Sequence, residues 1–130
     1  MLTVIAVTGA TGRLGGRVAK RLAAAGLPQR LLVRDPARAP QLKGTTVSPA
    51  AFTDREAVCA ALDGVDIVLM VSASEAPDRV DQHRAFVDAA AAAGVAHLVY
   101  VSFFHAARDA TFTLARDHWA TEQHVRASGM

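Results

Sequence analysis

Short apolar runs alternate along the chain with longer stretches in which apolar residues recur at the spacing of an α-helix. Runs of this length, bounded by glycine, proline and small polar residues, are typical of buried β-strands. The apolar runs cover residues 3–8, 30–34, 45–48, 66–71 and 97–102, and the helical patterns cover residues 13–25, 53–62, 77–93 and 114–127. Strands that alternate with helices predict an α/β fold, in which right-handed crossovers connect the strands of a parallel sheet.

We predict a doubly wound sheet with the strand order 3-2-1-4-5. In such a sheet the first and fourth strands are neighbours, and a ligand binds in the crevice between their carboxyl ends. The run at 66–71 is almost entirely apolar, which predicts a strand covered on both faces. Thr53 and Glu56 have the spacing of a capping box, so we expect Thr53 to begin the helix over residues 53–62.

Three glycines separate the first predicted strand from the first predicted helix. Gly9, Gly12 and Gly15 have the spacing Gly-x-x-Gly-x-x-Gly, close to the Gly-x-Gly-x-x-Gly pattern of dinucleotide-binding proteins. Such glycines allow a tight turn, close approach of a pyrophosphate to the backbone, and close packing of the helix on the strand. The amides and dipole of the helix N-terminus favour phosphate. The predicted phosphate loop comprises Gly9, Ala10, Thr11, Gly12, Arg13 and Leu14.

The end of the second predicted strand distinguishes the two nicotinamide dinucleotides. An acidic residue there binds the ribose 2′-hydroxyl of NAD, whereas an arginine binds the 2′-phosphate of NADP. Arg34 occupies this position, and Arg38 follows one turn later. Asp35 is a competing acid, but it precedes Pro36, an arrangement typical of a helix N-cap. We predict that Arg34 binds NADP, with NAD as the less favoured cofactor; the alternative is that both arginines are solvated surface charges.

Composition restricts the class of protein further. The chain has 130 residues, of which 52% are hydrophobic, and a formal net charge of +2. These values suit one folded domain and show no basic excess that would indicate nucleic acid. No apolar run reaches the length of a membrane span. Cys59 is the only cysteine, which excludes an internal disulfide and fits a reducing compartment, so we expect a cytoplasmic protein.

The catalytic residues are the least defined part of the site. The Tyr-x-x-x-Lys pair of typical short-chain dehydrogenases cannot form, because the residue four positions after Tyr100 is a phenylalanine. His105 and His118 are the candidate proton donors, and for each the alternative is a packed or structural histidine. His83 is interpreted as an ordinary helix residue. The histidines and acidic residues do not have the spacing of metal ligands, so no metal site is predicted.

Five stretches spread over nearly the whole chain carry a resemblance to a known family. They are Thr8-Gly-Ala-Thr-Gly-Arg-Leu-Gly15, Val33-Arg-Asp-Pro-Ala-Arg38, Ser72-Ala-Ser-Glu75, Ala92-Ala-Gly-Val95 and His118-Trp-Ala-Thr-Glu122. In these stretches the chain resembles the NmrA-like, atypical short-chain dehydrogenase/reductase family, and within it the bacterial NAD(P)H:quinone oxidoreductases. The resemblance implies a Rossmann-type fold that holds NADPH through the glycine loop, through Arg34, and through the turn formed by Ser72, Ala73 and Ser74.

The resemblance also implies a function. It indicates an NADPH-dependent oxidoreductase that transfers hydride to a quinone-like small molecule, the cofactor carrying the chemistry. The alternative is an NAD(P)-sensing regulator that acts through a protein partner. Family members continue into further strands and a smaller substrate lobe, so residues 1–130 are expected to form an NAD(P)-binding domain that lacks this lobe. The strand at 97–102 would then be an open edge, which tends to recruit another chain, and a homodimer is a candidate assembly.

Overall fold

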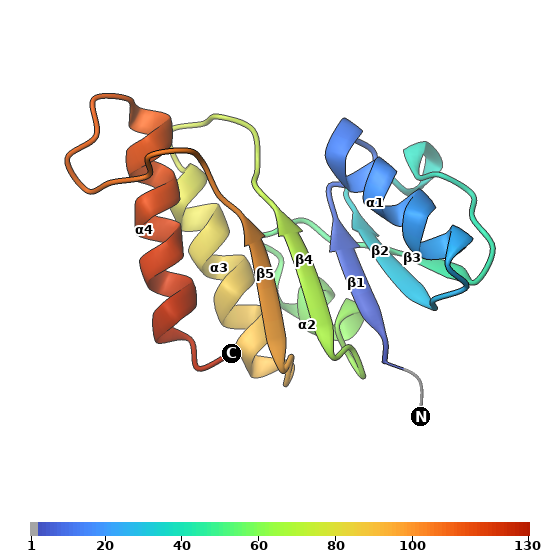
Figure 1. Cartoon of the computed structure of the whole chain (residues 1–130). Helices are drawn as coiled ribbons and strands as arrows, with labels where there is room; N and C mark the ends of the chain where they lie inside the picture. Colours follow the sequence, from blue (N-terminus) through green and yellow to red (C-terminus); the bar gives the residue numbers. More distant parts are fainter. Residues whose placement is uncertain (1–2) are drawn as a thin grey trace.

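A five-stranded parallel sheet forms the centre of the computed structural model, which describes residues 3–130 (Figure 1). Its strands are β1 (Ile5–Thr8), β2 (Gln29–Val33), β3 (Thr45–Pro49), β4 (Ile67–Val71) and β5 (His97–Val101). The helical elements are α1 (Arg13–Ala24), the 3-10 turn η1 (Pro36–Arg38), α2 (Arg55–Ala61), α3 (Arg79–Ala92) and α4 (Thr113–Ala127). The order across the sheet is β3-β2-β1-β4-β5, so the predicted α/β fold and strand order are confirmed.

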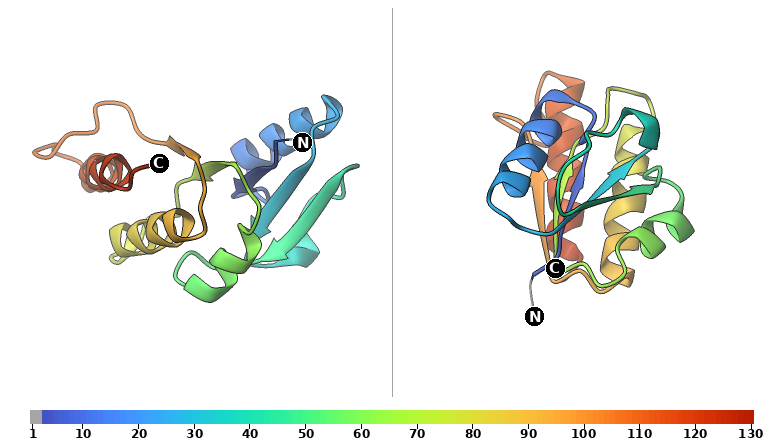
Figure 2. Two further views of the ribbon diagram at one scale, coloured as in Figure 1. Left: turned by 90° about the horizontal axis from the view of Figure 1, so that it is seen from below. Right: turned by 90° about the vertical axis from the view of Figure 1, so that its right-hand side faces the viewer.

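Successive residues of each strand point to opposite faces of the sheet, and the parallel register places residues of neighbouring strands side by side on the same face. Val7 of β1 pairs with Leu31 of β2 and with Leu69 of β4, and this face forms a cluster with the apolar residues of α1. The intervening residues, such as Val68, belong to a larger cluster that includes Phe86 of α3. Figure 2 shows the corresponding layers, with α1 on one side of the sheet and α2 and α3 on the other.

Coverage of the sheet is uneven around β4 and β5. Val68 and Met70 of β4 are fully buried, but Leu69 on the opposite face is only half-buried. Val99 of β5, which pairs with Leu69, is 45% exposed. The reason is that α1 packs against β1 and β2, while α4 packs on α3 and so leaves this face of β5 open (Figure 1). The prediction that residues 66–71 are covered on both faces therefore holds for one face only.

The N-cap of α2 lies one residue later than the sequence pattern indicated. Asp54 is its N-cap, and the Oδ1 atom of Asp54 accepts a hydrogen bond from the backbone N–H of Ala57 at 3.1 Å. A carboxylate at this position also interacts favourably with the helix dipole. The predicted capping box with Thr53 as its first residue is therefore wrong. Among residues 3–130, no helix combines the length and the hydropathy that crossing a bilayer requires.

Candidate functional site

The carboxyl ends of β1, β2 and β4 border a cleft of about 530 Å³. Strands β1 and β4 are neighbours, and the helices that follow them, α1 and α3, lie on opposite faces of the sheet (Figure 2). The cleft therefore lies where the strand order reverses, which is the usual ligand position in doubly wound sheets. Most of the residues predicted to bind a cofactor line it: Gly9, Thr11, Gly12, Arg34, Ser72, Ala73 and Ser74.

The glycine loop makes a tight turn into α1. Gly9 has a φ of 65°, in the left-handed region that side chains rarely adopt. Its carbonyl oxygen accepts a hydrogen bond from the N–H of Gly12 at 3.0 Å, which closes the turn. Gly12 is the N-cap of α1, and within the described part of the chain no side chain caps this helix end. The first amides of α1 are thus available to an anion at the edge of the cleft.

Close packing at Gly15 fixes where α1 begins relative to β1. A Cβ atom on Gly15 would fall against the carbonyl oxygen of Gly9, 2.5 Å from the carbonyl carbon of Gly9 and 2.8 Å from the carbonyl oxygen of Thr8. These are backbone atoms of the turn itself and cannot rotate away as a flexible side chain would. The packing role predicted for Gly15 is therefore confirmed.

Thr8 joins the glycine loop to the segment that follows β4. Its buried hydroxyl accepts a hydrogen bond from the backbone N–H of Val71 at 2.8 Å. A Cβ atom on Gly9 would lie 3.0 Å from the Cβ of Val71, so the two chain segments also touch at the turn. The sequence pattern indicated no role for Thr8 beyond its place in the motif, although it does place a hydroxyl at the last position of a buried strand.

Arg34 lines the cleft at the end of β2. Asp35 serves the adjacent turn instead, because its Oδ1 atom accepts a hydrogen bond from the N–H of Ala37 at 3.1 Å and caps η1. The interpretation of Asp35 as a cap is therefore confirmed. Arg38 ends η1 and lies outside the cleft lining, so Arg34 is the only lysine or arginine among the described residues that line the cleft.

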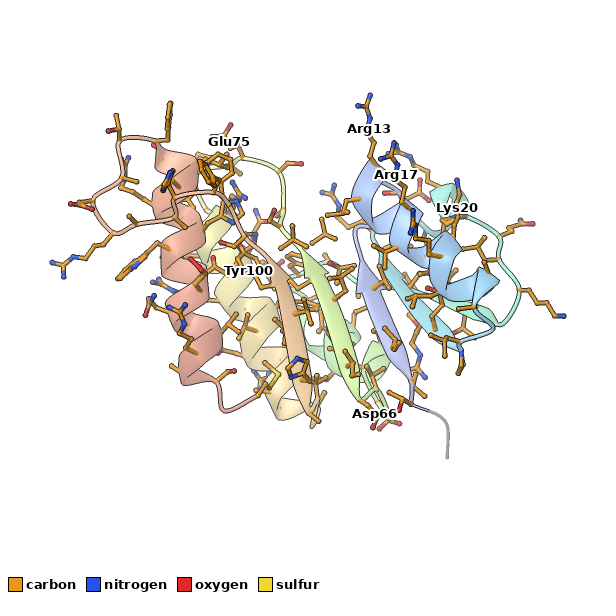
Figure 3. The ribbon with its side chains drawn as sticks, in the orientation of Figure 1. Arg13, Arg17, Lys20, Asp66, Glu75 and Tyr100 are labelled. Carbon is orange, nitrogen blue, oxygen red and sulfur yellow. The ribbon has the colours of Figure 1, made fainter. Side chains whose placement is uncertain are left out.

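Some predicted residues lie elsewhere, and some lining residues had no prediction. Ala10 is buried beneath the loop, and Arg13 and Leu14 lie on the exposed first turn of α1. In Figure 3 the side chain of Arg13 points away from the sheet. Phe52 and Gln82 line the cleft, although the sequence analysis assigned neither of them to the site. Phe52 follows β3 at the carboxyl edge of the sheet, where a ligand site is expected. Gln82 lies on α3, and no sequence pattern indicated that it would line the cleft.

Neither candidate proton donor lines the cleft. His105 lies on the exposed loop between β5 and α4, with a φ of 57°. His118 is 3% exposed, with its Nε2 atom 2.8 Å from Nη2 of Arg79 and its Nδ1 atom 2.6 Å from the Tyr100 hydroxyl. Since arginine only donates, Nε2 of His118 accepts and Nδ1 carries the proton. These contacts place His118 in a packed network, and a role of either histidine in proton transfer stays a prediction.

His83 is the histidine whose importance the sequence analysis missed. It is fully buried, its Nε2 atom lies 2.9 Å from the backbone nitrogen of Ala73, and its Nδ1 atom lies 2.9 Å from Oγ1 of Thr121. Helical periodicity gave no sign of these contacts, because one partner belongs to the loop after β4 and the other to α4. His83 therefore lies directly behind the part of the cleft formed by residues 72–74.

Burial determines the protonation states of this network. Burial, and after it the nearby Arg79 cation, lowers the pKa of His83 and of His118 to about 4. Burial raises the pKa of Tyr100, labelled in Figure 3, to about 12. At neutral pH both imidazoles and the phenol are therefore uncharged. Arg79 is itself only 2% exposed, and its Nε and Nη1 atoms have no hydrogen-bond partner within residues 3–130.

We expect the folded chain to lose stability as the pH falls from about 6.5 to about 4. In this interval the unfolded histidines, with an ordinary pKa of 6.5, bind protons that folded His83 and His118 do not yet bind. Linkage then reduces the free energy of unfolding by up to roughly 3 kcal/mol for each histidine at the acid end. Urea unfolding at pH 7 and pH 4.5 measures the loss, and His118→Gln should reduce it by about half. Equal stability of the wild type at both pH values would contradict the expectation.

The chain is similar in sequence to a known protein family and to curated reductases. The model of the NmrA-like family matches residues 1–129. The chain is 40% identical to Quinone oxidoreductase 2 of Escherichia coli K12 over 98% of its own length and 46% of that protein's. It is also 40% identical to NAD(P)H azoreductase of Xenophilus azovorans, of which it covers 45%. The chain thus spans about half the length of the curated relatives it matches.

The fold is also similar to that of a solved structure. The crystal structure of the NADPH-dependent quinone oxidoreductase QOR2 of Escherichia coli, complexed with NADPH, superposes with a TM-score of 0.86 at 40% identity. The match covers 97% of this chain and 46% of that one. The fold around the cleft is therefore shared with a protein that was crystallised with a nicotinamide dinucleotide.

Proposed function

The chain belongs to the NmrA-like family, and on that premise we propose that it binds NADPH in the cleft at the carboxyl ends of β1, β2 and β4. We propose further that residues 1–130 form the dinucleotide-binding domain of an oxidoreductase that reduces a quinone-like acceptor. One observation carries the proposal: the glycine loop, Arg34 and the Ser72–Ser74 turn meet at a single cleft, in a chain 40% identical to a quinone oxidoreductase.

The residues of the cleft fit a dinucleotide phosphate. The N-terminus of α1 has no side-chain cap among the described residues, and a Cβ atom on Gly12 would have only the carbonyl oxygen of Gly9 near it, at 3.3 Å. Free amides beside an open approach are what a pyrophosphate requires. The volume of about 530 Å³ also lies within the range of roughly 300–1,000 Å³ that is typical of ligand sites.

Different groups of the cleft would bind different parts of the cofactor. The backbone of residues 9–12 and the first amides of α1 would hold the pyrophosphate, and Arg34 would hold the 2′-phosphate through charge-assisted hydrogen bonds. The hydroxyls of Ser72 and Ser74, which follow β4, would contact the cofactor on the β4 side of the cleft. When bound, the reduced nicotinamide supplies the hydride. A quinone accepts hydride readily, so the chain's own task is to orient the cofactor and to exclude water.

The acid of typical short-chain dehydrogenases has no counterpart in this site. Tyr100 is the only tyrosine, and its hydroxyl lies 2.6 Å from Nδ1 of buried His118, outside the cleft lining. A tyrosine acid needs a neighbouring cation that lowers its pKa, whereas burial raises the pKa of Tyr100 to about 12. Reduction of an acceptor that needs no strong acid from the protein fits this arrangement better than alcohol oxidation.

We expect Arg34→Ala to weaken NADPH binding by about tenfold to a hundredfold, the range for losing one charge-assisted hydrogen bond. NADH has no 2′-phosphate, so its affinity should change by less than about twofold. Isothermal titration calorimetry with both cofactors measures the difference. Arg38→Ala is the matched control, since Arg38 lies outside the cleft lining, and it should bind NADPH like the wild type. Equal wild-type affinities for NADPH and NADH would contradict the role of Arg34.

Turnover tests the proposed reaction. NADPH oxidation with a benzoquinone should be followed by the loss of NADPH absorbance, for this chain and for any longer product of the same coding sequence. Steady oxidation that depends on the quinone supports the reductase. The second candidate is an NAD(P)-sensing regulator, and tight NADPH binding without turnover in either form would favour it over the reductase.

A further inference from the structure

The segment between β4 and α3 lines the cleft, yet few hydrogen bonds connect it to the rest of the domain. Residues 72–74 have no regular secondary structure. Within residues 3–130, one hydrogen bond reaches this segment: the backbone N–H of Ala73 donates to Nε2 of His83 at 2.9 Å. His83 is fully buried on the side of α3 that faces the segment. Beyond the end of β4, this bond to an imidazole nitrogen is therefore the one hydrogen bond, among the described residues, that ties the segment to the rest of the domain.

The hydrogen bonds of His83 determine its tautomer. A backbone N–H only donates, so Nε2 of His83 must be unprotonated to accept it. The proton of the neutral ring is then on Nδ1, which donates to Oγ1 of Thr121 at 2.9 Å. Thr121 in turn donates to the carbonyl oxygen of Asp117 at 3.0 Å. The bonds thus run in one direction, from the cleft segment through α3 to the backbone of α4.

We propose that His83 is a positioning residue that holds residues 72–74 in the geometry required to bind the cofactor, and that Thr121 of α4 orients its ring. The proposal rests on the proposed function where it concerns the cofactor. His83 is not part of the cleft lining, so its side chain would not touch a cofactor bound there. It acts through the backbone of Ala73, which is part of that lining.

The groups around His83 keep its imidazole neutral, so that Nε2 can accept the hydrogen bond from the N–H of Ala73. Arg79 lies four residues earlier on α3, His118 and Asp117 lie on α4, and Tyr100 lies on β5, with its hydroxyl 3.5 Å from Nδ1 of His83. The Arg79 cation and the low polarity of the interior both disfavour a second proton on the imidazole. Protonation would replace the acceptor at Nε2 by a donor facing the N–H of Ala73, so the bond exists only while the ring is neutral.

The first test uses the protein without cofactor. Long-range ¹H–¹⁵N NMR of the imidazoles should show the Nδ1–H tautomer for His83 at pH 7, and the Ala73 amide should exchange slowly with solvent. Acidification should protonate His83 only near pH 4, with a simultaneous change in the Ala73 amide shift. An Nε2–H tautomer, or an Ala73 amide that exchanges as fast as in an unfolded peptide, would overturn the proposal whether or not NADPH binds.

The second test compares two substitutions at His83. His83→Leu removes the acceptor and should weaken NADPH binding by about tenfold, the loss expected for one buried hydrogen bond that holds the site. His83→Gln retains an acceptor at a similar distance along the side chain, so it should bind within about threefold of the wild type. It should also keep its affinity at pH 4.5–5, where the affinity of the wild type begins to fall.

A matched control separates positioning from general loss of stability. Gln29 is also buried, and it donates to the carbonyl oxygen of Ala19 at 2.7 Å at the opposite end of the sheet. Gln29→Leu should lower the melting temperature, yet leave the NADPH affinity unchanged. If folded His83→Leu binds NADPH as tightly as the wild type, the proposal is wrong. If the wild type does not bind NADPH, the proposed function fails, and the NMR results still decide the role of His83.

Discussion

Replacing Gly15 by alanine is expected to destabilise the folded chain by about 3 kcal/mol or more, which is the upper range for overpacking. The added Cβ would lie 2.5 Å from the carbonyl carbon of Gly9 and 2.8 Å from the carbonyl oxygen of Thr8. Relief requires α1 to move away from the glycine loop, which would open the apolar cluster beneath that helix. Chemical unfolding followed by circular dichroism measures the effect.

Gly16→Ala is the control for this prediction. It is the same substitution at the next position of the same helix, but its Cβ would lie 3.1 Å from the carbonyl oxygen of Ala10, which a shift of a few tenths of an ångström relieves. Alanine also favours the helix over glycine by up to about 1 kcal/mol. Gly16→Ala should therefore change stability little. Equal unfolding free energies for the two variants would show that the contact at Gly15 does not limit the packing of α1.

Replacing Gly12 by valine should reduce NADPH affinity by at least about a hundredfold, because a branched side chain would occupy the space through which a pyrophosphate approaches the backbone. The fold should tolerate the change. Gly12 has a φ of −94° and a ψ of −178°, which any residue adopts, and its Cβ would meet only one backbone oxygen, at 3.3 Å.

Calorimetric titration together with a melting curve tests both halves of this prediction. The variant should melt within a few degrees of the wild type and show no measurable heat of NADPH binding. Gly16→Ala is again the control, and it should bind normally. A folded Gly12→Val chain that keeps its affinity would place the cofactor away from the glycine loop and remove the basis of the proposed site.

Local sequence patterns determined the order of the elements and the place of the cleft. Most strands and helices of this fold carry their own hydrophobic periodicity, and Gly9, Gly12 and Gly15 lie within seven residues of chain. Asp35 before Pro36 identified its own capping role, because both partners of that bond are local. Even the weakly patterned strand β3 could be located, since the alternation of strands and helices required an element there.

Local sequence patterns gave wrong predictions in two situations. In one, two adjacent residues could both cap the same helix; in the other, the burial of a strand face depended on helices far away in the sequence. Thr53 and Asp54 can both cap a helix, and the backbone path into α2, not the motif, selected Asp54. The half-open face of β4 and β5 follows from α4 packing on α3. An apolar strand sequence indicates burial on both faces, but it does not show where the helices that would cover each face are placed.

The sequence by itself determined the fold class, the strand order and the candidate phosphate loop, because these depend on hydrophobic periodicity and on glycines close together in the chain. Only the tertiary structure decided what the histidines do. His83 contacts a backbone amide ten residues earlier and a hydroxyl 38 residues later, and His118 contacts Arg79 across 39 residues. Burial and hydrogen-bond partners determine a tautomer and a pKa, and both exist only after the loop, α3 and α4 have packed together.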